Sequence, residues 1–271
     1  MRTQTLTMDS IRSIAPSVFA DQPHESRSSR YTYIPTSTVV EGLMANDFLP
    51  VRATQSSSRI EGKSEFTKHM LRFRHASAQD VAVGDSVPEL VVINSHDGTS
   101  AYKLMGGIFR LVCLNGMVVA DSMCGSISVR HTGNVVDDVI EGSFSVMQGV
   151  TRALDVSQDW QALRLSAPEQ QVFAEAAHEL RFADSDGKID TPIQAAQMLR
   201  ARRNEDRADD LWHTFNRVQE NAIRGGLSAH AGREHDYRRV TTRPVKGIDQ
   251  DVRLNRALWT LAEKMAQLKT A

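Results

Sequence analysis

The sequence is poor in cysteine and in aromatic residues, and no stretch of it reaches membrane-spanning length as a hydrophobic run. Its 271 residues include two cysteines, too few for a secreted scaffold held by disulfides. Residues 1–16 lack the continuous apolar segment of a secretion signal. We therefore expect a protein of the reducing cytoplasm that is neither exported nor inserted into a membrane.

Neither sign of charge dominates the chain. Lys and Arg number 32 and Asp and Glu number 33, which gives a formal net charge of -1. A molecule without a net field can bind nucleic acid only through local basic patches. The aromatic share of 6% also argues against an extended platform on which unpaired bases could stack.

Signatures of catalysis are missing as well. The sequence has no serine in a strand-to-helix elbow, no cysteine at a helix start, no phosphate loop and no dinucleotide fingerprint. Asp97 beside His96 could act as a general base, but an Asp-Gly pair at a hairpin tip is explained by turn chemistry. These absences favour a binding protein without a cofactor over an enzyme, and we assign no catalytic residue.

A zinc site has to be weighed because two cysteines and two histidines fall in one predicted sheet region. They are Cys113, Cys124, His96 and His131, and zinc favours mixed Cys and His ligands. Their spacing contains no chelating pair two to four residues apart. We therefore interpret the cysteines as small buried apolar side chains and predict no metal site.

Residues 89–121 carry the clearest structural pattern, in which β-type runs are separated by the segments HDG, GG and NG. Asp97-Gly98 and Asn115-Gly116 can adopt the positive φ of tight primed turns. The runs between them are rich in branched and aromatic residues, which favour strands. The pattern predicts an antiparallel meander, joined by strands at 49–54, 66–76 and 126–131.

Helical spacing prevails in the second half of the chain, after one earlier helix predicted at 36–45 with Thr36 or Ser37 as its cap. Further helices are predicted at 135–154, 168–182, 209–226 and 249–269. The glycine pair Gly225-Gly226 should end the third of these. Apolar stripes at helical spacing are expected in the first (Val135, Val139, Phe144, Val146, Val150 and Leu154) and in the last (Val252, Leu254, Leu258, Leu261, Met265 and Leu268). The predicted fold is therefore α+β, an antiparallel β-meander sheet packed with helices and followed by a helical C-terminal half. We expect a flexible arm at 1–30 that orders only against the body or a partner, a sheet domain at 31–160, and a helical region at 161–271 packed on it.

Two basic segments are candidates for binding nucleic acid. The loop predicted at 225–246 has five cations against Glu234 and Asp236, a local excess of plus three: Arg233, Arg238, Arg239, Arg243 and Lys246. Its glycines and threonine hydroxyls suit a loop that closes on a sugar-phosphate backbone. The alternative interpretation is a solvated linker between two helices.

The second basic segment is the strand predicted at 66–76, where alternation places Lys68, Arg72 and Arg74 on one face. The alternative is the polar side that any half-exposed sheet shows to water. If this face lies near the basic loop, the two form one groove. Tyrosines that could then stack on unpaired bases are Tyr31, Tyr33, Tyr102 and Tyr237.

Several segments, among them KHMLRFR, FRLVCLNGMVV and TTRPVKGIDQDVRLNRALW, resemble the phage- and plasmid-associated domain of unknown function family 932. The resemblance runs over most of the chain in order and spacing. It implies a protein of prophages, plasmids and other mobile elements, and it implies no reaction.

Two hypotheses follow. The first is a nucleic-acid-binding protein, expected as a homo-oligomer, that handles single-stranded DNA in recombination or replication of a phage or plasmid. A curved antiparallel sheet followed by a long helix also occurs in strand-annealing recombination proteins, which is an analogy of fold alone. The second is a host-directed enzyme or inhibitor of the anti-defence type, which recognises an anionic substrate or a protein partner.

Overall fold

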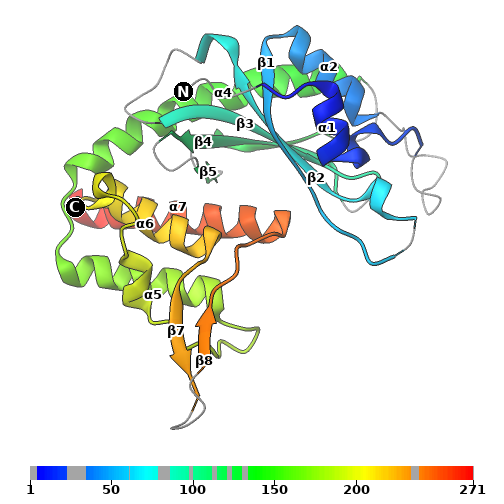
Figure 1. Ribbon diagram of the computed structural model, residues 1–271. Coiled ribbons are helices and arrows are strands. Elements are labelled where there is room, and N and C mark those ends of the chain that lie inside the picture. The colour runs from blue at the N-terminus through cyan, green and yellow to red at the C-terminus, as the bar shows by residue number, and fades with distance from the viewer. Residues whose placement is uncertain are drawn as a thin grey trace. The chain divides into compact units, whose positions relative to one another are not determined.

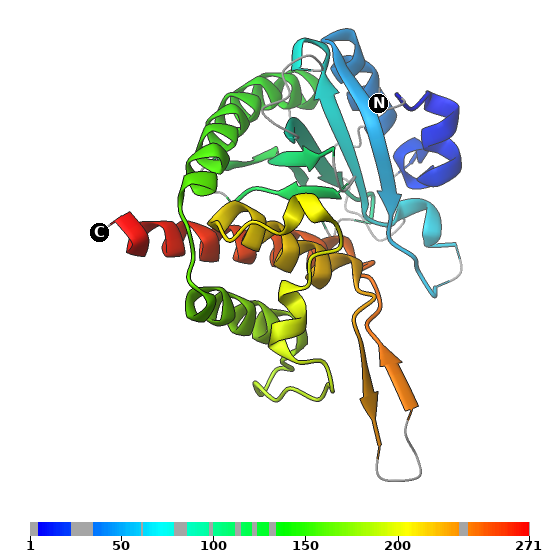
Figure 2. The ribbon, with the colours of Figure 1, turned by 60° about the vertical axis from the view of Figure 1, so that its left-hand side comes forward.

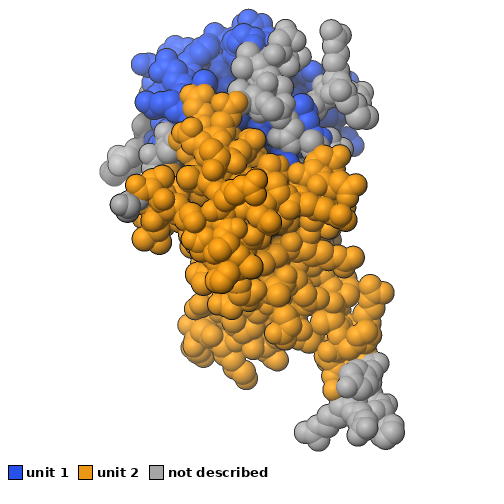
Figure 3. Space-filling view, turned by 90° about the vertical axis from the view of Figure 1, so that its left-hand side faces the viewer, with its two compact units in different colours: residues 1–154 blue, residues 155–271 orange. Residues whose placement is uncertain are grey.

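The computed structural model describes residues 5–22, 35–60, 62–78, 86–97, 100–111, 115–120, 124–129, 134–232 and 238–270. The chain divides into two compact units, Met1–Leu154 and Asp155–Ala271, which are coloured separately in Figure 3. We call them unit 1 and unit 2 and describe each by itself. Among the described residues, no helix is both long enough and apolar enough to cross a membrane.

Unit 1 is built on an antiparallel sheet (Figure 1). Strands β1 (Phe48–Gln55), β2 (His69–His75), β3 (Ser86–Asn94), β4 (Tyr102–Arg110) and β5 (Asn115–Val118) pair in chain order. Strand β6 (Ser126–Val129) pairs with the first half of β4. Pairing in chain order defines a meander, so the predicted antiparallel meander sheet, followed by a helical C-terminal half, is confirmed.

The glycine pair predicted to separate two strands lies inside β4 instead. Gly106 pairs with Leu90 of β3, and Gly107 pairs with Glu89. A Cβ atom on Gly106 would lie 2.6 Å from Cys124 Sγ and 2.6 Å from a methyl group of Val150. Glycine is therefore needed here because other groups approach the backbone closely, and the interpretation of Gly106-Gly107 as a turn is wrong.

The turn predicted at Asn115-Gly116 is also wrong. Both residues belong to β5, where they pair with Arg110 and Phe109 of β4, and the φ of Gly116 is not positive. Strand β4 ends at Arg110, and residues 112–114 before β5 lie outside the described residues. The other predicted turn, at Asp97-Gly98, includes Gly98, which is outside the described residues too.

Helices α1 (Met8–Ile14), η1 (Pro16–Phe19) and α2 (Thr36–Ala45) precede the sheet, and short turns η2 (Ser64–Phe66) and η3 (Ala76–Ala78) flank β2. Residues 5–22 belong to the segment predicted as an arm, and they do pack on the body of unit 1. The side chains of Ile11 and Val18 are fully buried, and Ser17 Oγ lies 2.9 Å from Nδ1 of His69 in β2.

Helix α4 (Val135–Ala162) covers one face of the sheet. Its buried stripe is Val135, Val139, Val146 and Val150, and a Cβ atom on its Gly142 would lie 2.8 Å from Leu104 of β4. The stripe follows the predicted helical spacing, except that Phe144 is 43% exposed. The helix also continues past its predicted end at Leu154 into unit 2.

Unit 2 contains α5 (Ala167–Phe182), η4 (Ala195–Leu199), η5 (Asn204–Asp206), α6 (Leu211–Arg224), β7 (Ser228–Ala231), β8 (Arg238–Thr241) and α7 (Ile248–Thr270). An aromatic cluster forms its core: the ring of Trp160 lies 4.7 Å from Trp259 of α7 and 5.9 Å from Phe215 of α6. The predicted apolar stripe of α7 is buried at Leu254 and Leu258, but Leu268 is exposed.

Candidate nucleic-acid interface

The segment predicted as a basic loop forms a regular β-hairpin of strands β7 and β8. Ser228 pairs with Thr241 and Ala231 pairs with Arg238. Hydrogen bonds from Gly226 N to the Thr242 carbonyl and from Thr242 N to the Leu227 carbonyl continue the ladder to the base of the hairpin. The segment 225–246, predicted as a basic loop, therefore contains two paired strands. Figure 2 shows the hairpin extending away from α5, α6 and α7.

Glycine at position 225 connects α6 to this hairpin. Gly225 has a φ of 66° and ends α6. The prediction that the glycine pair ends this helix is therefore confirmed. A Cβ atom there would also lie 2.6 Å from the Thr242 carbonyl oxygen. The hairpin thus leaves the helix at a point where only glycine satisfies both the backbone conformation and the close approach of the second strand.

The predicted cations on this hairpin are exposed. Arg238, Arg239, Arg243 and Lys246 all lie at the surface, and none forms an ion pair with a described residue. Arg238 stands opposite Ala231 and Arg239 opposite His230. Neighbouring residues of a strand point to opposite faces, so each face of the hairpin carries a guanidinium group. The fifth predicted cation, Arg233, lies outside the described residues.

A cluster of arginines lies at the root of the hairpin. The Arg202 guanidinium donates to Asn221 Oδ1 over 2.9 Å and also to the Gly225 carbonyl. Partial burial lowers the pKa of Arg202, Glu220 opposes this, and nearby arginines lower it further: Arg224, Arg203 and Arg200. The contact of Arg202 with Gly225 places this arginine cluster where the hairpin begins.

Two carboxylates partly neutralise this arginine cluster. Glu220 forms ion pairs with Arg203 and Arg224, each with 2.8 Å between guanidinium nitrogen and carboxylate oxygen. Arg203 also pairs with Asp206, at a nitrogen-to-oxygen distance of 2.6 Å. Arg200 is exposed without an ion pair to a described residue. Sequence reasoning missed the cluster because Arg224 lies far along the chain from the run RARR at 200–203, although that run was a visible signal.

The basic strand face predicted in β2 is buried at its centre. Arg72 is 2% exposed and Arg74 is 4% exposed, and both pair with the fully buried Glu89 of β3, at 2.9 and 2.8 Å. The prediction that Arg72 and Arg74 present charge to solvent is therefore wrong, because a neighbouring strand supplies their counter-charge. Lys68, just before β2, remains partly exposed.

The Arg72 side chain also explains two glycines of the sheet. It donates to the Met117 carbonyl of β5 over 3.3 Å, and a Cβ atom on Gly116 would lie 2.6 Å from its Nη1 atom. A Cβ atom on Gly107 would also lie close to Arg72, 3.2 Å from the same Nη1 atom. Because β3 and β4 separate β2 from β5, this contact requires a strongly curled sheet with Arg72 on its inner face. We conclude that Arg72 supports the fold.

A buried polar cluster surrounds Thr36, whose side chain was predicted as a possible helix cap. Pro35 occupies the cap position. The Thr36 hydroxyl lies 3.0 Å from His69 Nε2, from His96 Nε2 and from Asn94 Nδ2, and 3.3 Å from the Tyr102 hydroxyl. Tyr102 is fully buried, so it cannot stack on a nucleic-acid base. The other three candidate tyrosines lie outside the described residues.

His69 is held neutral in this polar cluster. Burial, with His96 as a second cause, lowers the pKa of His69 to about 3, against the opposing effect of the Thr67 carbonyl. That carbonyl lies 3.3 Å from Nδ1, so Nδ1 carries the proton and Nε2 accepts the Thr36 hydroxyl proton. Asp97, weighed above as a general base, pairs with Lys63 at 3.3 Å. Among the described residues, no group of His, Cys, Asp and Glu side chains could hold a metal ion.

Fold and surface together describe an α+β protein with an exposed basic hairpin. The chain belongs to the family described as a domain of unknown function, DUF932, whose model matches residues 23–259. It is 44% identical over 267 residues to the UPF0380 protein YafZ of Escherichia coli (strain K12), which covers 97% of this chain and 93% of that protein. The UPF0380 protein YfjQ of the same strain is 44% identical over 264 residues, with the same coverage. No solved structure matches the chain.

Proposed function

We propose that this protein binds single-stranded DNA through the β7–β8 hairpin, in the cytoplasm, during recombination or replication of a phage or plasmid. The observation that carries the proposal is the exposure of Arg238, Arg239, Arg243 and Lys246 without an acidic partner among the described residues. Cations of this kind exchange bound water and counterions for phosphate oxygens. Binding then gains from counterion release and depends little on base sequence.

The distribution of charge favours a single strand over a duplex. Arg238 and Arg239 point to opposite faces of a narrow hairpin. A flexible single strand can bend around such a ribbon and contact both faces. A duplex, with a persistence length of about 150 base pairs, stays straight over this distance and meets one face. The described residues offer few aromatic surfaces, so phosphate contacts rather than base stacking carry the proposed binding.

The setting in a mobile element rests on the family resemblance described under Sequence analysis. Binding that ignores base sequence suits a protein that must act on whatever single strand replication or recombination exposes. The arginine cluster of Arg200, Arg202, Arg203 and Arg224 lies at the root of the hairpin. We expect it to add contacts to the same bound strand.

The test is binding of fluorescent single- and double-stranded oligonucleotides, followed by anisotropy over a series of salt concentrations. Replacing Arg238, Arg239, Arg243 and Lys246 with Ala should weaken single-strand binding for every sequence used. The slope of log affinity against log salt should flatten by about 0.7 for each phosphate that is no longer neutralised. Folding should survive, because exposed charges contribute little to stability.

A matched control removes the same number of exposed cations elsewhere in unit 2: Lys188, Arg207, Arg253 and Lys264, each changed to Ala. This control lowers the net charge equally but leaves the hairpin intact, so its affinity should stay close to wild type. Equally weakened binding in both variants would mean that net charge, and not the hairpin, drives binding. Absence of binding by the wild type at low salt would refute the proposed function.

The alternative, a host-directed enzyme or inhibitor, would use the same hairpin to contact a protein. One observation favours it: the outer edges of β7 and β8 have no strand partner among the described residues, and such edges can be extended by a strand from another protein. This alternative becomes the better account if the wild type binds no oligonucleotide.

A further inference from the structure

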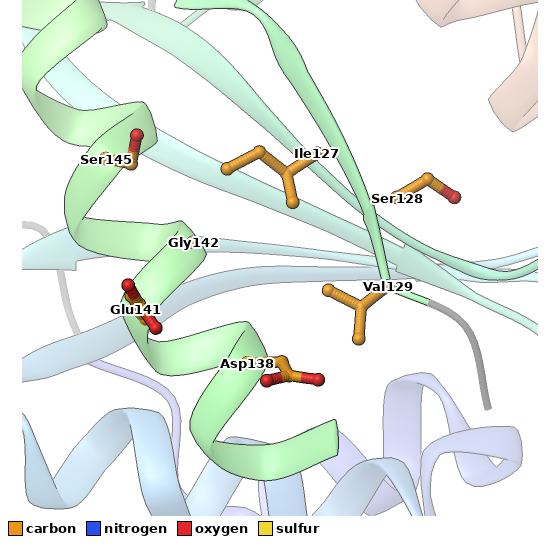
Figure 4. A pocket seen from close by; sticks show the side chains of 7 residues that line it. All are labelled: Ile127, Ser128, Val129, Asp138, Glu141, Gly142 and Ser145. Atoms are coloured by element: carbon orange, nitrogen blue, oxygen red, sulfur yellow. The ribbon is translucent and has the colours of Figure 1, made fainter. Parts of the chain in front are cut away.

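Unit 1 has an acidic recess beside an open sheet edge. The recess has a volume of about 430 Å³ and lies between β6 and the first turns of α4, lined by Ile127, Ser128, Val129, Asp138, Glu141, Gly142 and Ser145. Figure 4 shows Ile127 and Val129 pointing toward α4, while Ser128 points the other way. The recess therefore has an apolar wall from β6 and a carboxylate rim from α4.

The carboxylates of this recess are not neutralised by described residues. Asp138 and Glu141 are exposed, and the side chain of neither forms an ion pair or hydrogen bond with a described residue. They lie one helical turn apart, where like charges repel each other. None of the described residues that line the recess is a lysine or an arginine. A cationic side chain placed in it would relieve this repulsion.

The neighbouring strand is open on one side. β6 pairs with β4 from Tyr102 to Met105, and no described strand pairs with its other edge. An open edge presents backbone N–H and C=O groups that can hydrogen-bond to an added strand. An occupant that is both a strand and cationic would satisfy the edge and the recess together.

This chain contains such a strand in β8. β6 and β8 are each 4 residues long, and β8 pairs only with β7 among the described strands. It carries Arg238 and Arg239, which point to opposite faces, so one of them faces the recess whichever way the strand is added. We infer that β8 of one copy adds to β6 of a second copy, with its inward arginine between Asp138 and Glu141.

The two surfaces of this contact differ from each other, so the contact is heterologous. Each copy offers one hairpin and one recess, and repetition of the contact produces a closed ring or an open filament. The inference does not require that the protein bind nucleic acid. Because it uses the same arginines, a bound single strand should compete with the second copy for the hairpin.

The test is the molecular mass in solution, measured by sedimentation velocity over a range of protein and salt concentrations. Wild type should form species larger than the 30.1 kDa chain, and they should dissociate as salt is raised. Asp138→Lys with Glu141→Lys should be monomeric, and so should Arg238→Glu with Arg239→Glu. A chain that carries all four changes should assemble again, because the charges are exchanged and remain complementary.

A matched control reverses two exposed carboxylates one turn apart on another helix, by Glu175→Lys with Glu179→Lys in α5. This control should assemble like wild type. Three outcomes overturn the inference: a wild type that is monomeric at every concentration, a recess variant that still assembles, or an exchanged chain that stays monomeric. If the hairpin docked on the recess of its own chain, the wild type would be monomeric at every concentration, which is the first of these outcomes.

The recess variant also separates this inference from the proposed function. Asp138→Lys with Glu141→Lys leaves the hairpin unchanged, so it should bind single-stranded oligonucleotides as a monomer. Loss of assembly with retained binding supports both ideas. Assembly that survives the change refutes the inference alone, and a wild type that assembles but binds no oligonucleotide refutes the proposed function alone.

Discussion

Acid should destabilise unit 1 through His69. In the folded protein the pKa of this histidine is about 3 against an ordinary value of 6.5, so the folded state stays neutral where the unfolded state takes up a proton. The unfolded state therefore binds more protons below pH 6.5, and the free energy of unfolding falls as the pH falls from 6.5 toward 3. Above pH 6.5 His69 is neutral in both the folded and the unfolded state, so the free energy of unfolding no longer depends on its protonation.

The expected size follows from the shift in pKa. One unit corresponds to about 1.4 kcal/mol, so His69 alone should remove about 1.4 kcal/mol of stability for each pH unit between 6 and 4. Over that window the loss is about 3 kcal/mol, a large fraction of a typical domain stability of about 5–15 kcal/mol. His69→Gln cannot take up this proton, so its stability should fall more slowly with acid.

The measurement is urea-induced unfolding followed by circular dichroism at several values between pH 8 and pH 4.5. His69→Gln should be less stable than wild type at pH 8, because it loses hydrogen bonds to Thr36 and Ser17. The gap between the two proteins should then narrow as the pH falls. Parallel curves for wild type and variant would refute the assignment of a neutral, buried His69.

Two further predictions concern the inner face of the sheet. Gly116→Ala should cost about 1–3 kcal/mol of stability, because the new Cβ atom would lie 2.6 Å from Arg72 Nη1. The control is Gly247→Ala, which should change stability little because no atom lies nearer than 3.9 Å to its new Cβ atom. Equal melting temperatures for the two variants would contradict this prediction. Glu89→Gln should cost about 3–5 kcal/mol, since it removes the buried carboxylate that pairs with both Arg72 and Arg74. Glu179→Gln at the surface is the control. A loss below about 1 kcal/mol in thermal or urea unfolding would show that the two arginines do not need the charge of Glu89.

The sequence predicted the elements of the fold well where one local signal decided them. The end of α6 followed from a glycine pair, and the buried stripe of α4 followed from its valines. The two errors in the meander have one cause. Gly106 and Gly116 are glycines because side chains from distant parts of the chain approach them: Val150 of α4 and Cys124 approach Gly106, and Arg72 of β2 approaches Gly116. A sequence window contains no information on such contacts.

The candidate site was predictable to a smaller degree. Exposure of Arg238 and Arg239 followed from their dense local charge, but burial of Arg72 and Arg74 did not, because their partner Glu89 lies on another strand. An alternating strand of cations has the same sequence pattern whether water or a carboxylate faces it. The cluster around Thr36 was hidden for the same reason, since its members come from positions as far apart as 36, 69 and 96.

The aromatic core of unit 2 determines what optical experiments on this protein report. All 3 tryptophans, Trp160, Trp212 and Trp259, lie in that unit, and their rings are in contact or nearly so. Intrinsic tryptophan fluorescence therefore follows the melting of unit 2 and is blind to the sheet. Circular dichroism responds to both units. If the two signals change at different denaturant concentrations, the units unfold independently, and coincident transitions would show that they unfold as one cooperative system.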